Sequence, residues 1–479
     1  MALALAAAFA FASGSAAAQN VLYLVKDIVP GSGGISTYYP VAVNGKLFFT
    51  ASDGIHGGEL WKSDGTGTAL VRDIWPGPSH AFPTYLAESS GKLFFVADDG
   101  VHGSELWKSN GTAVGTVLVR DIRPGPVSSF EDDIVDVNGT VFFVADDGLS
   151  GMELWKSDGT EAGTMLVRDI WPGTVHPRGE HPANCVNVDG ALFFDADGGA
   201  NGRELWQSDG TETGTLLVRD IWPGTGSGIS FAPQERAHAG GVLYFTASDG
   251  IHGRELWKSD GTEAGTVLVR DIQPGSGSSN PHLLVEVGGS VFFAADDGTH
   301  GWELWKSDGT DAGTVLVRDI RPGFEHSAMG RFTDVDGTLF LMADDGTHGK
   351  ELWKSDGTEA GTVLVRDIEP GAGSSIPTWL VNGNGTLYFN AGDGSTGAEL
   401  WQSDGTAAGT VLVADLFPGE GSSDPWWPTV VDETLYFNAD DGVSGRELWA
   451  LPEPAHPAAL ACGIALLAAL ARRRRIPRF

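Results

Sequence analysis

Short apolar runs separated by glycine-rich turns recur along the chain. Residues 281–320 contain four such runs, PHLLVEV, SVFFAADD, ELWKSD and TVLVRDI, divided by Gly-Gly, DGTHGW and GTDAG. Runs of this length between Gly and Asp turns are typical of β-strands. The second run is apolar at each position from 291 to 295. Because a strand buried on both faces lacks polar alternation, we expect each four-stranded unit to pack between two neighbours.

This unit repeats along the sequence with a nearly constant period. The tripeptide Glu-Leu-Trp occurs nine times, at intervals of 46 to 51 residues, with its Trp at positions 61, 107, 155, 206, 257, 305, 353, 401 and 449. Such a period lies between those of the WD40 and kelch propellers and excludes the shorter helical and leucine-rich repeats. We therefore predict an all-β fold, a single β-propeller of about nine four-stranded blades.

The two ends of the repeat region complement each other. The segment VLYLVKDIVPG, residues 21–31, matches a fourth strand, whereas the last repeat stops after a third strand at Glu447–Trp449. If residues 21–28 join the last sheet, every blade has four strands and the ring closes. Closure removes two sheet edges that would otherwise favour aggregation. The N-terminal strand is thus expected to complete the last blade.

A charge pattern predicts the register between the third and fourth strands. If Ser109 faces Thr116 across the turn, then Glu105 faces Arg120. Exposed pairs of this kind contribute only about 0.2 to 1 kcal/mol each, so they serve as register markers. The same count predicts the pairs Glu59 with Arg72, Glu153 with Arg168, Glu303 with Arg318 and, at the closure, Glu447 with Lys26.

The charge balance excludes one class of partner. The chain has 63 acidic and 30 basic residues, a formal net charge of −33 at pH 7, and would repel the phosphates of DNA and RNA. An acidic surface attracts divalent cations and basic partners, or serves only to keep a large protein soluble. The two cysteines, Cys185 and Cys462, provide no disulfide framework, so packing must hold the fold together.

Both ends of the chain differ from the repeats over residues 19–450. Residues 1–18 are apolar and end in small residues, which predicts a signal peptide cleaved after Ala18. As a helix, the apolar run of residues 457–471 would be about 22 Å long, shorter than the roughly 30 Å hydrocarbon core. Residues 451–479 contain this run together with Pro452, Glu453, Pro454, Arg472, Arg473, Arg474 and Arg475.

Two parts of the sequence resemble known families. ELWKSDGT, ELWKSNGT or ELWQSDGT, followed by LVRDI and a Pro-Gly pair, resembles the ELWxxDGT repeat family over nearly all of residues 21–449. That resemblance implies a secreted or surface-displayed bacterial protein and names no ligand. The tail resembles the PEP-CTERM sorting signal, which implies cleavage near Pro452–Pro454 by an exosortase-type processing enzyme. In that interpretation Arg472–Arg475 hold the tail at the cytoplasmic face during a transient membrane association.

Repeated acidic turns are the first candidates for chemistry. The sequence Ser-Asp-Gly-Thr, as at residues 157–160, suits a tight hairpin. The turn at Asp98–Gly103 carries carboxylates and a His, and Ca²⁺ takes oxygen ligands of this kind. We favour a purely structural turn and keep Ca²⁺ as the alternative, because the His position of this turn is occupied elsewhere by Ser150, Asn201, Thr396 and Ser444.

An irregular segment between the third and fourth repeats offers another candidate. His176, Glu180, His181 and Cys185 have the residue types of a metal hydrolase, but no second cluster with recognised spacing accompanies them. A proline-bracketed loop is the favoured interpretation. The sequence contains no G-x-S-x-G, H-E-x-x-H or phosphate-binding loop. We therefore assign no catalytic, cofactor-binding or metal-binding residue.

The predicted function follows from the small number of residues that do not recur from repeat to repeat. Non-repeated residues are confined to 173–185, 223–240 and the pair Trp426–Trp427, and the acidic pairs recur in every repeat. Repeated carboxylates identify no acid and base. We predict a non-catalytic exported scaffold or binding protein at the cell surface, with exopolysaccharide or another envelope component as partner. The alternatives are an extracellular hydrolase acting on polysaccharide and a Ca²⁺-binding adhesion protein.

The sorting interpretation predicts the fate of a tail variant. Replacing Pro452, Glu453 and Pro454 by alanine should leave the tail uncut and the protein in the membrane fraction, as measured by cell fractionation and immunoblotting. A chain that lacks residues 455–479 is the control and should be released. Normal release of the triple variant would reject the sorting signal.

Overall fold

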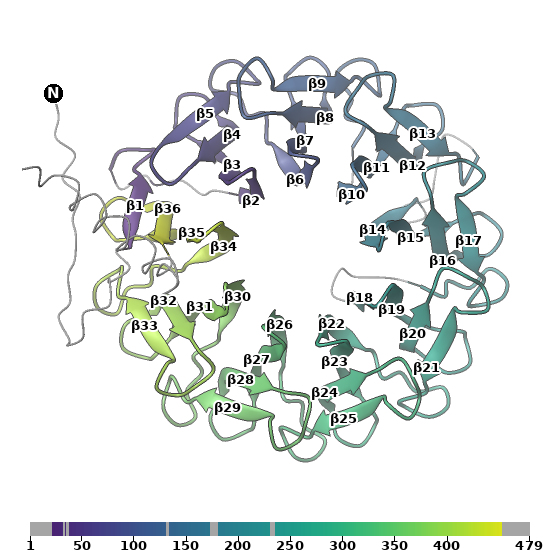
Figure 1. Ribbon diagram of the computed structural model, residues 1–479, viewed down its shortest axis with the longest axis vertical. Helices are drawn as coiled ribbons and strands as arrows, with labels where there is room; N and C mark the ends of the chain where they lie inside the picture. The colour runs from purple at the N-terminus through teal and green to yellow at the C-terminus, as the bar shows by residue number, and fades with distance from the viewer. Residues whose placement is uncertain are drawn as a thin grey trace, which may run out of the picture.

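The repeats form a closed ring of blades. The computed structural model describes residues 22–31, 34, 38–130, 134–172, 181–229 and 235–452. These residues form nine four-stranded antiparallel sheets placed around a ring (Figure 1). The predicted nine-bladed β-propeller is therefore confirmed. Within the described part of the chain, no helix is long and apolar enough to cross a membrane.

Each blade consists of an inner, a second, a third and an outer strand, and blades one to nine follow the chain from β2 onward. The inner strands are β2 (Tyr38–Val43), β6 (Thr84–Ser89), β10 (Val135–Val137), β14 (Ala183–Val188), β18 (Arg236–Ala239), β22 (His282–Val287), β26 (Gly330–Val335), β30 (Thr378–Gly383) and β34 (Trp426–Val431). The second strands are β3 (Lys46–Ser52), β7 (Lys92–Asp98), β11 (Thr140–Asp146), β15 (Ala191–Asp197), β19 (Val242–Ala247), β23 (Ser290–Asp296), β27 (Thr338–Asp344), β31 (Thr386–Gly392) and β35 (Thr434–Asp440). The third strands are β4 (Gly58–Ser63), β8 (Ser104–Ser109), β12 (Met152–Ser157), β16 (Arg203–Ser208), β20 (Glu255–Ser259), β24 (Trp302–Ser307), β28 (Lys350–Ser355), β32 (Ala398–Ser403) and β36 (Arg446–Pro452). The outer strands are β5 (Thr68–Arg72), β9 (Val117–Arg120), β13 (Met165–Arg168), β17 (Leu216–Arg219), β21 (Val267–Arg270), β25 (Val315–Arg318), β29 (Val363–Arg366), β33 (Val411–Ala414) and, in blade nine, β1 (Tyr23–Lys26).

The two ends of the chain meet in blade nine, as expected from the split repeat. Strand β1 pairs antiparallel with β36, with Tyr23 opposite Ala450 and Leu24 opposite Trp449. The sheet order is β1-β36-β35-β34, so the N-terminal strand is the outer strand of the last blade (Figure 1). Ile28, which follows β1, is buried in a cluster shared with blade one. The N-terminal strand therefore closes the ring.

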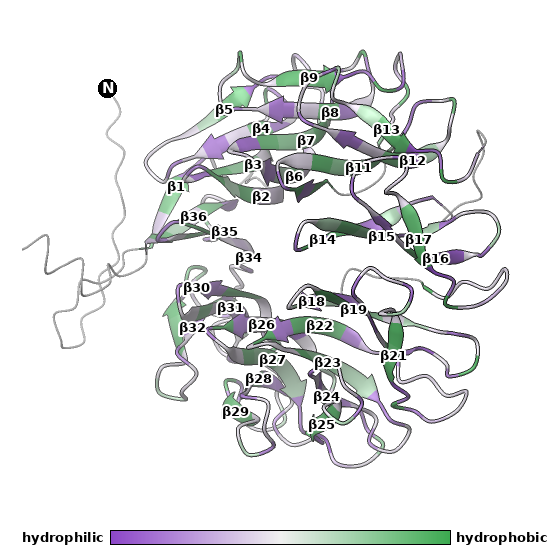
Figure 2. Cartoon of the chain, turned by 45° about the vertical axis from the view of Figure 1, so that its right-hand side comes forward, coloured by the Kyte–Doolittle hydropathy of each residue, from purple (hydrophilic) through white to green (hydrophobic). Residues whose placement is uncertain are grey.

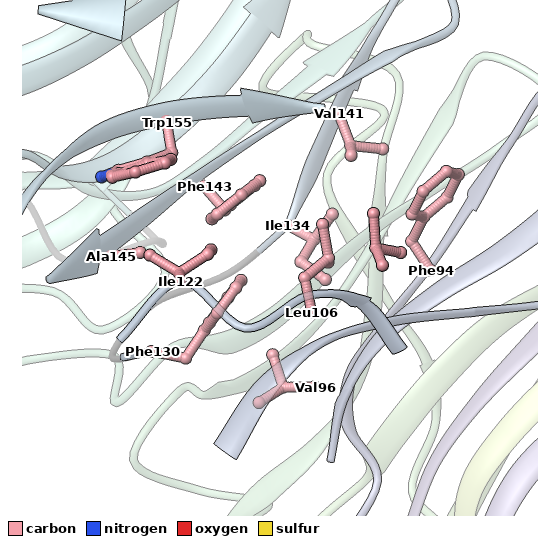
Figure 3. Close-up of a cluster of buried hydrophobic side chains, with 11 residues drawn as sticks. Phe94, Val96, Leu106, Ile122, Phe130, Ile134, Val141, Phe143, Ala145 and Trp155 are labelled. Carbon is pink, nitrogen blue, oxygen red and sulfur yellow. The ribbon is translucent and has the colours of Figure 1, made fainter. Parts of the chain in front are cut away.

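The hydrophobic core lies between neighbouring blades. Between blades two and three, Phe94 and Leu106 contribute from one side and Phe143 and Trp155 from the other, all nearly inaccessible to solvent (Figure 3). Phe130, in the segment that connects the two blades, stacks on Phe143 with ring centroids 4.9 Å apart. Figure 2 shows hydrophobic stretches along strands such as β11 and β22. Both faces of each second strand are thus covered, as predicted.

The predicted pairing of glutamate with arginine is wrong. Ser109 does face Thr116, with their hydroxyl oxygens 2.7 Å apart. A β-bulge between Leu106 and Trp107 then shifts the register, so that Leu106 rather than Glu105 lies opposite Arg120. The same shift places a leucine opposite the cation at the other predicted pairs, namely Leu60 with Arg72, Leu154 with Arg168, Leu304 with Arg318 and Leu448 with Lys26.

The outer-strand cations reach the next blade instead. Arg120 lies over the ring of Trp155, with its guanidinium carbon 5.7 Å from the ring centroid, and donates a hydrogen bond to the carbonyl of Thr164. This cation–π contact joins blade two to blade three. At the closure Lys26 takes the same place over Trp61, at 5.2 Å. The positive charge therefore links consecutive blades rather than strands of one blade.

Because of the bulge these glutamates do not face the cations. They are buried instead, and they accept hydrogen bonds from the crossover segments, which lead from one blade to the next. The Glu105 carboxylate accepts hydrogen bonds from the backbone amide of Ile122 at 3.1 Å and from the hydroxyl of Ser129 at 2.7 Å. Both donors lie on the segment that leads from the outer strand to the next inner strand. Burial raises the pKa of Glu105 to about 7, although these hydrogen bonds act in the opposite direction. Each crossover is thus fixed to the third strand before it.

Removing the closing strand β1 should destabilise the ring far more than removing the same number of residues from the C-terminal end. A chain that starts at residue 29 loses β1 and the buried Ile28 and exposes an unpaired edge of β36. We expect its melting temperature to fall by more than about 5 °C relative to the chain that starts at residue 19. A chain that lacks residues 470–479, an equal number, is the control. Equal melting temperatures for the two truncations would contradict closure by β1.

The buried glutamates predict a loss of stability with rising pH. Burial raises the pKa of Glu303 from 4.5 to about 8. The folded chain therefore holds this proton more tightly than the unfolded chain, and stability present below about pH 4.5 is lost as the pH rises through 8. We expect the urea midpoint to be lower at pH 8 than at pH 5, and Glu303→Gln to reduce that difference.

Glu351→Gln is the matched control for this experiment. In the described structure Oε1 of Glu303 has no hydrogen-bond partner and can be replaced by an amide group, whereas both oxygens of Glu351 accept hydrogen bonds. The Glu351 substitution should therefore lower the urea midpoint at both pH values. A pH dependence that Glu303→Gln leaves unchanged would contradict the role of its ionisation.

Candidate functional site

The inner strands interrupt the regular pattern of the blades. In most of them the register with the second strand shifts near the first residues, as between Tyr38 and Val41 in blade one. The extra residue of such a bulge bends the strand and redirects a side chain. The extra residue of each bulge has a backbone in the left-handed region, with φ between 51° and 59°. These residues are Tyr39, Tyr85, Asn184, Leu283, Arg331, Trp379 and Trp427.

This conformation is unfavourable for large side chains. Residues other than glycine rarely adopt positive φ, and bulky ones do so least. Such strain persists only where the surrounding structure imposes it, and it gathers at binding and active sites. The side chains that the inner strands carry at the bulge are therefore candidates for a binding site.

Aromatic side chains at the bulge gather on blades eight, nine and one. The ring centroid of Trp427 lies 5.2 Å from that of Trp379 and 5.9 Å from that of Tyr39. Arg331 of blade seven extends the group, with its guanidinium carbon 5.9 Å from the Trp379 centroid. Strands β26, β30, β34 and β2 are neighbours around the centre of the ring (Figure 1). We call Tyr39, Trp427, Trp379 and Arg331 the aromatic arc.

The arc remains accessible to a ligand. Tyr39 is 40% exposed, Arg331 is exposed, and Trp379 and Trp427 are half-buried. One end of the arc borders a cavity of about 630 Å³ between blades six, seven and eight. Its lining includes His282, Leu283, Met329, Arg331, Phe332 and Trp379. The arc therefore borders a concave surface that combines aromatic and apolar side chains with polar groups, and ligand sites are concave surfaces of mixed lining.

A cation and two carboxylates lie beside the other end of the arc. Arg446 covers the ring of Trp426, with its guanidinium carbon 4.1 Å from the centroid, and its Nη2 is 3.8 Å from a carboxylate oxygen of Asp424. Burial lowers the pKa of Arg446, while Asp424, Asp440 and Tyr38 act in the opposite direction. Two carboxylates therefore lie in the electrostatic field of one arginine, next to an exposed tryptophan.

In the acidic turns singled out from the sequence, the carboxylates form hydrogen bonds within the turn itself. Oδ1 of Asp99 accepts hydrogen bonds from the amides of Val101 and His102, and its Oδ2 lies 2.9 Å from Nδ1 of His102. In the Ser-Asp-Gly-Thr turn, hydrogen bonds from Thr160 lower the pKa of Asp158. Across the described ranges, no group of three His, Cys, Asp or Glu side chains is arranged to hold a metal. Calcium binding stays an untested prediction.

The other sequence candidates do not assemble into a site. His176 and Glu180 lie outside the described residues. Cys185 is buried in the core between blades three and four, and Nδ1 of His181 is 2.8 Å from the carbonyl oxygen of Pro182. Of the sorting residues, Pro452 ends β36, while Glu453, Pro454 and Arg472–Arg475 lie outside the described part of the chain.

Sequence reasoning identified only one member of the aromatic arc. It singled out the pair Trp426–Trp427 as non-repeated, and Trp427 does lie in the arc. Tyr39, Trp379 and Arg331 were missed because they belong to repeats that look ordinary elsewhere. Comparing the inner strands alone would have found them, since YYPVAV, TWLVNG and WWPTVV carry an aromatic residue at their second position and GRFTDV carries an arginine there.

Comparisons with known proteins give one kind of match. No family model and no curated protein matches the sequence. Among solved structures, a puromycin hydrolase is 14% identical with a TM-score of 0.37, over 75% of this chain and 58% of that one. A Mycobacterium tuberculosis puromycin-hydrolyzing peptidase is 10% identical with a TM-score of 0.43, over 86% and 60%. Prolyl oligopeptidase B from Galerina marginata is 10% identical with a TM-score of 0.42, over 81% and 52%.

These neighbours correct the predicted function. The sequence interpretation made the chain a non-catalytic scaffold and no enzyme, whereas these structural neighbours are peptidases, which contradicts it. The matched region spans just over half of each peptidase. At such low identity the likeness extends to the fold alone, so any activity must be argued from the residues of this chain.

Proposed function

We propose that this propeller is the substrate-binding part of an extracellular hydrolase that acts on a polysaccharide. The observation that carries the proposal is the aromatic arc, in which three aromatic rings from three consecutive blades lie 5.2 to 5.9 Å apart at the centre of the ring. Pyranose rings present apolar C–H faces that stack on the negative face of an aromatic ring. Consecutive aromatic rings therefore suit consecutive sugar units.

The backbone strain supports a binding role for these side chains. The bulge holds Tyr39, Trp379 and Trp427 at φ values of 52° to 55°, at a cost of order 1 to 3 kcal/mol for each residue. The same bulge occurs at Asn184 and Leu283, so the aromatic side chains at this position, rather than the strain, distinguish blades eight, nine and one. Rings held in place in advance lose little conformational freedom when a ligand binds.

The two carboxylates beside the arc provide the chemistry that hydrolysis requires. Glycoside hydrolysis generally uses a pair of Asp or Glu residues on either side of the bond that breaks. Asp424 lies 3.8 Å from Arg446, which covers Trp426, and Asp440 lies opposite Arg446 in the sheet. We place the reaction at this end of the arc, with one carboxyl group donating a proton to the leaving oxygen and the other acting on water or the sugar carbon.

Export and sorting form part of the same proposal. In this proposal residues 1–18 are the signal peptide. The resemblances to the ELWxxDGT family and to the PEP-CTERM tail support a location at the cell surface. Strand β36 ends at Pro452, so a cut beside Pro454 would leave all nine blades intact. An exosortase-type enzyme is the expected processing partner.

Substitutions at the two ends of the arc should separate binding from turnover. Trp379→Ala should weaken binding of a purified polysaccharide about tenfold or more by calorimetry, because a stacking surface is lost. Asp424→Asn should retain binding and lower the release of reducing ends by roughly 10² to 10⁴.

Trp222→Ala is the control, because Trp222 is a tryptophan that is 40% exposed but belongs to the segment after the outer strand β17. It should change neither binding nor turnover. Wild-type protein that binds polysaccharide without releasing reducing ends would reject hydrolysis. Binding that is unaffected by Trp379→Ala would reject the arc as the binding surface.

A further inference from the structure

Arg331 differs from the repeated arginines of this fold. Arg318 and Arg366, on outer strands, each lie over a tryptophan of the next blade and donate a hydrogen bond to a threonine carbonyl. Arg331 also lies against a tryptophan, but it sits on an inner strand and is exposed. Among the described residues, its guanidinium has no ion pair within 4.0 Å and no hydrogen bond.

Arg331 is exposed on a chain that has a large excess of carboxylates. With 63 acidic residues against 30 basic ones, carboxylates are abundant, yet the described lining of the cavity beside Arg331 contains no Asp or Glu. The other titratable group of that lining is His282, whose Nδ1 lies 3.1 Å from the carbonyl oxygen of Asn280. The cavity is therefore a local cationic site on an acidic protein.

We infer that the substrate is an acidic polysaccharide and that Arg331 recognises its carboxylate groups. This inference rests on the proposed function and adds the substrate class. The guanidinium offers parallel N–H donors that match a carboxylate in a bidentate arrangement. The guanidinium carbon of Arg331 lies over Trp379, 5.9 Å from the ring centroid, so a uronic acid bound against this tryptophan would carry its carboxylate near the cation.

The backbone of the inner strands argues against a peptide as the ligand. A peptide usually binds a free sheet edge by adding a strand through regular main-chain hydrogen bonds. Here each inner strand is the sheet edge at the centre of the ring, and the bulge places Arg331, Trp379 and Trp427 in the left-handed region at the positions that a peptide bound there would meet. Bulges of this kind end regular pairing. Side-chain recognition of a sugar chain requires no such pairing.

Acidic and neutral forms of one oligosaccharide test the inference. We expect wild-type protein to bind a hexamer of galacturonic acid at least tenfold more tightly than its fully methyl-esterified form, by calorimetry at constant ionic strength. Arg331→Gln should abolish this preference by lowering the affinity for the acidic hexamer to that of the same variant for the ester, and Arg331→Lys should retain part of the preference, because the charge persists without the bidentate geometry.

Arg123→Gln is the control for net charge, since Arg123 pairs with Asp146 between blades two and three. It should retain the wild-type preference. Equal affinity of wild-type protein for both hexamers, or a preference that survives Arg331→Gln, would overturn recognition of the carboxylate and leave the proposed function standing. Failure to bind either hexamer, or tighter binding of a poly-glutamate peptide than of the acidic hexamer, would reject the polysaccharide function itself.

Discussion

The need to cover both faces of every second strand determines the architecture. Phe94 of β7 packs in the cluster shared with blade three, while Leu93 and Phe95 of the same strand pack in the cluster shared with blade one. No blade can bury both surfaces alone, and an open row would leave two blades half covered. Closing the ring satisfies every blade at once, and it requires the two chain ends to share one sheet, as β1 and β36 do.

The buried glutamates and the outer-strand cations set the positions of neighbouring blades. Each glutamate fixes the crossover that delivers the next inner strand, as Glu105 does through Ile122 and Ser129. Each cation binds a tryptophan of the next blade, as Arg120 does with Trp155. A buried carboxylate is unfavourable unless its hydrogen bonds are satisfied. The crossover is therefore held in one conformation.

This division of tasks leaves the inner strands free to differ. The second and third strands repeat because each pairs with a strand on both sides, and the outer strands repeat because their cations contact the next blade, whereas the inner strand has a free edge at the centre of the ring. The bulge presents one side chain of an inner strand at that edge. This side chain is aromatic on blades eight, nine and one and cationic on blade seven. The proposed recognition of an acidic sugar chain depends on this difference between blades, not on the symmetry.

The sequence by itself determined the number of blades, their four strands and the closure, because burial on both faces and a split repeat are both visible in the order of residues. It gave the wrong partner for Glu105, since a bulge moves the register by one residue and leaves the hydrophobic pattern unchanged. It singled out Trp427 but not Trp379, Tyr39 or Arg331, which lie 48 or more residues apart along the chain. Only ring closure brings blades nine and one together and places Tyr39 against Trp427, because proximity across the closure depends on the curvature of the whole ring.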